Sequence, residues 1–112
     1  MEILRDVKDD IPFIYFCGEI TALDAPSVKQ VFNDLIKEGK FNVVLDLGKA
    51  SSIDGTGISS IVGGFTALRK HNGTLKILSP SSPIRSTFKQ AGLSRFFDIF
   101  EDEFEVLFSF QS

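Results

Sequence analysis

The segment Asp54–Gly57 (Asp-Gly-Thr-Gly) is the part of the chain whose residue types and spacing could support chemistry. It follows an apolar stretch and precedes a helical pattern, so it lies where a strand gives way to a helix, and parallel α/β sheets gather their sites at such junctions. The two glycines suit a tight turn, and either Asp54 or Thr56 can cap the helix that follows. A structural role for the turn is therefore expected whatever its function.

Catalytic interpretations of this turn lack residues that they require. The nucleophile loop of haloacid-dehalogenase-type phosphatases needs a second aspartate two residues before Asp54, and that position is Ser52. A phosphate-binding P-loop needs a lysine after the glycines, and none follows. His71, the only histidine, ends a helical pattern as a favourable cation, and no His/Cys cluster is available for a metal. We therefore expect no catalytic residues, metal or cofactor. A small enzyme that acts on phosphate remains a less favoured alternative to the binding functions considered below.

Composition narrows the class of protein further. The chain has 112 residues, 43% of them apolar, and its net charge of −3 comes from mixed acidic and basic residues. It lacks the basic block that follows a phosphate backbone and the run of about 20 apolar residues that crosses a membrane. We therefore expect one domain over residues 1–112, cytoplasmic, binding neither nucleic acid nor membrane. Cys17 lies in an apolar run and is predicted to be an inert, buried thiol.

Apolar periodicity predicts the elements that position this turn. Strands alternate with helices, which indicates crossover connections and a mainly parallel sheet, while the first two strands are close enough to form a hairpin. Asp24 is expected to cap the first helix, which starts near Pro26. The tail from Asp102 fits both a helix and a strand, and we favour a helix. The predicted strands are 3–7, 12–20, 41–47, 74–78 and 96–100; the predicted helices begin near Pro26, Thr56 and Ser82 and end before Gly39, Gly73 and Gly92.

The order and spacing of five short motifs give a family resemblance. The motifs are Gly18-Glu19-Ile20, Val43-Val44-Leu45-Asp46-Leu47, Ile53-Asp54-Gly55-Thr56-Gly57-Ile58, Gly73-Thr74-Leu75 and Ala91-Gly92-Leu93. Together they resemble the STAS domain of anti-sigma factor antagonists over nearly the whole chain. The resemblance implies a single STAS-like α/β domain, a mixed, mainly parallel sheet of about five strands with helices mostly on one side.

The resemblance also implies partners and a switch. In that family the unphosphorylated antagonist binds a GHKL-type serine kinase that doubles as the anti-sigma factor, and this frees the sigma factor. Phosphorylation at the turn blocks the binding, and a phosphatase is then a further partner. A constitutive STAS scaffold without a switch is the alternative, and we expect a monomer or weak homodimer.

This chain departs from the family pattern at two positions. The residue directly after Asp54, usually the phosphorylated serine, is Gly55, which has no hydroxyl. Thr56 is therefore the first phosphorylation candidate and Ser52 the second. The family commonly has an acidic residue directly after its Gly-Glu-Leu motif, and this chain has Thr21 at that position.

The helix after the turn carries an unusual stripe of small residues. Its apolar residues cluster on one side, and Thr56, Ser60, Gly63 and Ala67 follow the other side at helical spacing. A solvated face usually carries long polar side chains, so the stripe favours a partner surface; burial by another part of this chain is the alternative. The predicted partner-binding residues are Thr21, Asp54, Gly55, Thr56, Gly57, Ser60, Gly63 and Ala67.

Overall fold

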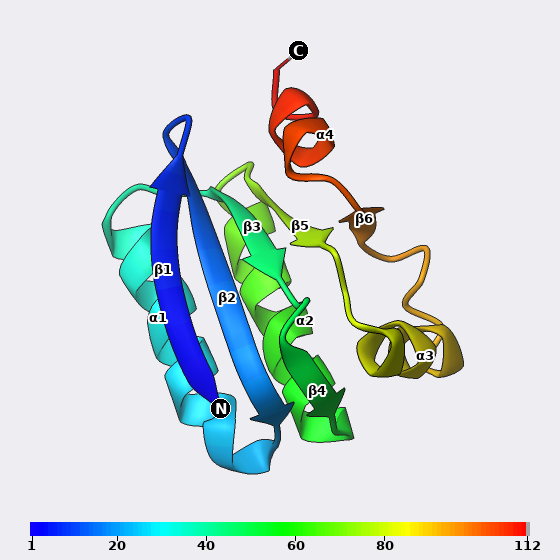
Figure 1. The fold of residues 1–112 in the computed structure, drawn as a ribbon. Helices are drawn as coiled ribbons and strands as arrows, with labels where there is room; N and C mark the ends of the chain where they lie inside the picture. The colour runs from blue at the N-terminus through cyan, green and yellow to red at the C-terminus, as the bar shows by residue number, and fades with distance from the viewer. Residues whose placement is uncertain (112) are drawn as a thin grey trace.

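A six-stranded mixed sheet organises residues 1–111, the part of the chain that the structure, a computed structural model, describes (Figure 1). The strands are β1 (Glu2–Lys8), β2 (Ile11–Ile20), β3 (Asn42–Asp46), β4 (Ala50–Ile53), β5 (Thr74–Leu78) and β6 (Asp98–Phe100). The helices are α1 (Ala25–Lys37), α2 (Gly55–Arg69), α3 (Ser82–Gln90) and α4 (Glu103–Phe108), with a 3-10 turn, η1 (Ala22–Asp24), before α1.

The strands follow the order β1-β2-β3-β5-β6, and β4 pairs with β2 beside this path. β1 and β2 form the predicted antiparallel hairpin, in which Lys8 lies opposite Ile11. Asp9 and Asp10 make the two-residue turn with φ of 51° and 65°, the left-handed conformation that such hairpins require. All other pairs are parallel, so the expected mixed, mainly parallel sheet is confirmed. The sixth strand, β4, was not predicted.

Both faces of the sheet carry a core, because alternate residues of a strand point to opposite sides. Phe13 and Ile14 of β2 are both fully buried, but they belong to different clusters. The larger cluster joins the sheet to α1, α2 and α3, and the smaller one joins it to α4 through Val106. The expected placement of the helices mostly on one side is therefore confirmed.

The tail forms a helix, as favoured from the sequence. Asp102 caps α4 by accepting a hydrogen bond from the Glu105 backbone N–H at 3.1 Å. The prediction that Cys17 is buried is wrong, because this residue is only half-buried. Cys17 alternates with Phe13 and Tyr15 and so shares the side of β2 that faces α4, but α4 packs mainly on β5 and β6.

Candidate functional site

Two loops lie side by side at the carboxyl ends of β2 and β4. These strands are parallel, with Ile20 opposite Ile53, so the chain leaves both at the same edge. The backbone N–H of Asp54 donates to the Ile20 carbonyl at 3.1 Å, which extends the pairing into the turn. The segment after β2 and the turn before α2 therefore form one surface.

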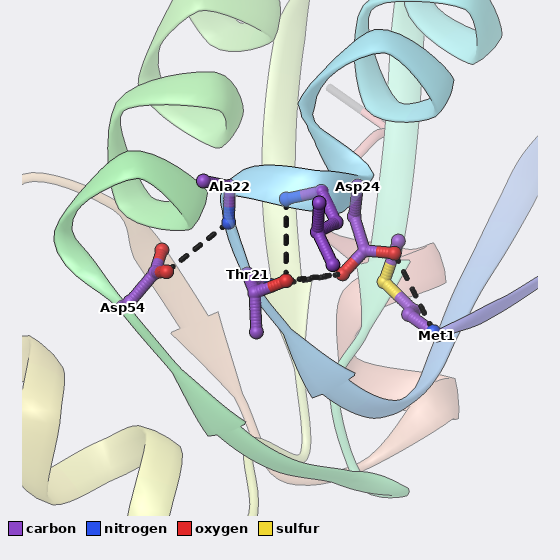
Figure 2. Close-up of polar contacts among 6 residues, drawn as sticks. Met1, Thr21, Ala22, Asp24 and Asp54 are labelled. Atoms are coloured by element: carbon purple, nitrogen blue, oxygen red, sulfur yellow. Dashed lines mark hydrogen bonds and ion pairs between the residues drawn. The ribbon is translucent and has the colours of Figure 1, made fainter.

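The carboxylate of Asp54 holds the two loops together. Its Oδ1 accepts a hydrogen bond from the Gly57 backbone N–H at 2.7 Å and so caps α2. Its Oδ2 accepts another from the Ala22 backbone N–H at 3.1 Å, across the gap to η1 (Figure 2). Of the two capping candidates, Asp54 is the cap and Thr56 lies within the first turn of α2. A carboxylate also suits the positive end of the helix dipole.

A second carboxylate, that of Asp24, fixes the neighbouring loop. Its Oδ2 accepts a hydrogen bond from the Thr21 backbone N–H at 2.8 Å. Figure 2 shows its further contacts with the Thr21 hydroxyl and with the Met1 ammonium group, each at 3.4 Å. The Thr21 N–H, followed by the ammonium charge, lowers the pKa of Asp24. The expectation that Asp24 caps the first helix with its side chain is therefore wrong, since η1 intervenes and the carboxylate serves Thr21 instead.

The residues of the turn differ in accessibility. Asp54, Gly55 and Thr56 are exposed, whereas Ser52 lies half-buried within β4. Thr56 is therefore the more accessible of the two predicted phosphorylation candidates. Gly57 is buried: a Cβ atom there would lie 2.8 Å from Cγ1 of Ile53, so only glycine lets α2 start this close to the sheet.

The rest of the predicted surface lines a groove between α1 and α2. Gly63 is exposed, and an added Cβ would meet nothing within 4 Å in the described part of the chain. Directly beneath it, Gly64 is buried against the ring of Phe32. The groove has a volume of about 500 Å³ and is lined on the α2 side by Ser60, Gly63 and Ala67 and on the α1 side by Ala25, Pro26 and Lys29.

Sequence reasoning missed Leu23, the most exposed of the large apolar side chains. It is 91% exposed and lies in η1, next to the residue that donates to Asp54. Its backbone N–H donates to Thr21 Oγ1 at 3.3 Å, which completes the capping of η1. A lone apolar residue in a loop gives no periodic signal, so only the structure reveals it.

Two searches of residues 1–111 bear on the kind of site. Nowhere in this range do three His, Cys, Asp or Glu side chains gather closely enough to hold a metal ion. No helix in the same range is long and apolar enough to cross a membrane.

Comparison with known proteins identifies the family. The model of the STAS domain matches residues 2–106. The chain belongs to the STAS family. An anti-sigma-B factor antagonist of Listeria monocytogenes is 34% identical to this STAS protein over 110 residues, which cover 95% of this chain and 96% of the relative.

Solved structures share the fold. An anti-sigma factor antagonist from Mycobacterium paratuberculosis matches with a TM-score of 0.85 at 18% identity, covering 99% of this chain and 94% of the other. The Bacillus cell-fate determinant SpoIIAA in its phosphorylated form matches with a TM-score of 0.75 at 19% identity, covering 98% and 100%. The resemblance seen in the five motifs is thus confirmed, and the STAS fold positions the two loops.

Proposed function

We propose that this STAS protein is an anti-sigma factor antagonist that acts by partner switching in the cytoplasm. The observation that carries the proposal is the 34% identity to an anti-sigma-B factor antagonist over nearly the whole of both chains. The partner we propose is a GHKL-type serine kinase that doubles as the anti-sigma factor. The antagonist itself is not an enzyme in this proposal: both carboxylate oxygens of Asp54 accept backbone hydrogen bonds, which suits a structural role.

The proposed partner surface begins at the two joined loops and continues along α2. Thr21 and Asp24 hold η1 in one conformation, so Leu23 is presented as a fixed apolar side chain. Anchors of this kind bind well because little freedom is lost when they enter a partner's pocket. Along α2 the surface consists of Asp54, Gly55, Thr56, Ser60, Gly63 and Ala67, while Gly57, which the sequence also predicted, is buried beneath it.

We propose phosphorylation of Thr56 as the switch, with Ser52 as the second candidate. The kinase would transfer the γ-phosphoryl group of ATP to the Thr56 hydroxyl: a new O–P bond forms, the bond to the β-phosphate oxygen breaks, ADP leaves and the hydroxyl proton is released. The phosphate adds about −1.5 to −2 charges at the start of a helix, where the dipole and free amides favour an anion. The fold should therefore tolerate it, while the charge beside Asp54 disrupts the contact with the partner. A phosphatase would reverse the step.

The absence of a hydroxyl at Gly55 favours a second candidate function, a constitutive STAS scaffold. Gly55 is exposed, its φ is not in the left-handed region, and an added Cβ would meet nothing within 4 Å in the described part of the chain. The fold therefore has room for a serine at position 55. The hydroxyl is missing because the chain has glycine there, and the backbone does not require glycine.

Incubation with the cognate kinase and ATP, followed by peptide mass spectrometry, distinguishes the two functions. We expect phosphate on Thr56 and its loss in Thr56→Val, whereas Ser52→Ala should retain it. Gly55→Ser is the matched gain-of-function variant and should become phosphorylated at the substituted position. Phosphate found only outside residues 51–60, or none in the wild-type protein although Gly55→Ser is modified, would refute the switch at Thr56 and favour the scaffold.

A further inference from the structure

The outer face of α4 exposes two large aromatic side chains. Phe104 is 75% exposed and Phe108 62%, although residues of this size are normally buried. They are four residues apart and so project from the same side of the helix. Their ring centroids are 6.2 Å apart and the planes are tilted by 16°, so the two rings form a single apolar ridge.

The helix that carries this ridge is firmly attached to the sheet. Val106, on its inner side, is fully buried in the smaller core. The ammonium group of Lys76 on β5 donates to the Ser109 Oγ at 2.8 Å and to its carbonyl at 3.2 Å. The same ammonium lies 4.2 Å from the centre of the Phe110 ring. The ridge is thus presented rigidly, and its exposed rings are not needed for these attachments.

The ridge is surrounded by negative charge. Residues 98–111 contain five acidic residues and no lysine or arginine. Lys8 pairs with Glu103, and Arg85 pairs with Glu101. Among residues 1–111 no ion pair involves Asp102 or Glu105, so the surface keeps an excess of negative charge.

We infer that the outer face of α4 is a docking surface for a cationic amphipathic helix of another protein. Apolar side chains at helical spacing on that helix would pack on the Phe104–Phe108 ridge, and its lysines or arginines would meet Asp102 and Glu105. A second copy docking through the same face would bring these carboxylates against each other. Anionic lipid and nucleic acid would be repelled by the same charges.

This surface is separate from the site at Asp54. In Figure 1, α4 lies at the end of the molecule opposite the arrowhead of β4 and the start of α2. A partner on the two loops would leave α4 free. The inference therefore does not depend on the proposed function, and two partners could be held at once.

Titration of the isotope-labelled protein with a designed peptide tests the inference. The probe is a helical peptide of roughly 18 residues, about five turns, with leucines on one face and lysines on the other. We expect amide shifts confined to residues 101–111 and the neighbouring strand ends. Binding should weaken at least tenfold in Phe104→Ser/Phe108→Ser, which keeps the net charge. It should be unchanged in Leu23→Ser, which removes an even more exposed apolar side chain at the other end.

Three results would overturn the inference. They are equal binding by the Phe104→Ser/Phe108→Ser variant, equal binding of a leucine–glutamate peptide, and a dimer seen by sedimentation that this variant abolishes. Glu105→Lys provides a second check that leaves the aromatic ridge intact. It should weaken the leucine–lysine peptide and strengthen the leucine–glutamate peptide.

Discussion

At the scale of single residues, the site depends on the way one carboxylate is shared. Asp54 accepts from Gly57 within its own turn and from Ala22 on the neighbouring loop. Hydrogen bonds to an ionised acceptor are stronger than neutral ones, so this side chain both starts α2 and fixes η1. The sequence predicted that either Asp54 or Thr56 caps α2, because helix capping is a local pattern. It could not predict the bond to Ala22, which depends on β2 and β4 being neighbours.

Replacement of Asp54 should therefore cost stability and loosen η1. We expect Asp54→Ala to lower the free energy of unfolding by about 1–2 kcal/mol, the usual cost of losing an N-cap, measured by urea denaturation. Asp54→Asn is the matched control: its amide oxygen can still accept from Gly57, so the loss should be smaller. Faster amide hydrogen exchange at Ala22 should accompany the alanine variant. Equal stability of Asp54→Ala and the wild-type protein would contradict the assigned role.

At the scale of elements, two successive glycines of α2 have opposite surroundings. Glycine is unfavourable inside a helix, so its presence indicates a close approach, and the sequence placed Gly63 on the predicted partner surface. The structure shows that Gly64 has this role within the chain: a Cβ there would lie 2.4 Å from two carbons of the Phe32 ring on α1. The sequence could not separate the two, because the contact is set by how α1 packs on α2.

Alanine at these two positions should change stability in opposite directions. Gly63→Ala should raise the free energy of unfolding by about 0.5–1 kcal/mol, because alanine is the better helix former and the space is open. Gly64→Ala should lower it by about 1–3 kcal/mol, because Phe32 must move. Thermal melts of the two variants, which differ only in the position of one methyl group, measure this directly. A gain at both positions would mean that α1 lies farther from α2 than the structure shows.

A larger side chain at Gly63 tests whether the exposed face of α2 is the partner surface. Gly63→Arg should leave the isolated protein at least as stable as the wild type, since the position is exposed. It should also block the groove and abolish capture of the proposed kinase partner. A lower melting temperature of Gly63→Arg would mean that the partner surface has been assigned to the wrong side of α2.

At the scale of the whole molecule, the fold was predictable where apolar periodicity was strong. The five predicted strands and the three main helices were all found, and the hairpin and the parallel crossovers followed from connection lengths. β4 was not predicted because Ala50–Ile53 is only four residues long and has two serines in the middle, which gives no strand pattern. It exists because β2 is ten residues long: its first half pairs with β3, and from Gly18 onward it pairs with β4, with a shift of register between Gly18 and Glu19.

Ion pairs between distant parts of the chain determine how stability depends on pH. Asp24 ties the N-terminus to η1, and the Thr21 N–H and the Met1 ammonium group lower its pKa. Glu38, at the end of α1, accepts hydrogen bonds from Arg5 of β1, which lower its pKa as well. Conversely, the hydrogen bond to Glu103 raises the pKa of Lys8 to about 12.

The direction of each pKa shift determines the pH range in which its contribution to stability is lost. A carboxylate with a lowered pKa stabilises the fold above its unfolded value of about 4 and loses this contribution as the pH falls through the folded value. A lysine with a raised pKa contributes below its unfolded value of about 10.4 and loses this contribution as the pH rises through about 12. The free energy of unfolding should therefore be flat between about pH 5 and 9 and fall below about pH 4.

Asp24→Asn should reduce this acid sensitivity, because an amide cannot be protonated in this range. We expect the variant to be less stable than the wild type at pH 7, where the carboxylate is ionised beside the ammonium group, and to differ from it less at pH 3. Urea unfolding at the two pH values measures both differences. Glu38→Gln is the matched control: its ion pair with Arg5 is solvent-exposed, and such pairs contribute little, so its effect should be smaller at both pH values. Parallel loss of stability in the wild type and Asp24→Asn would mean that the bond between the N-terminus and η1 does not stabilise the folded protein.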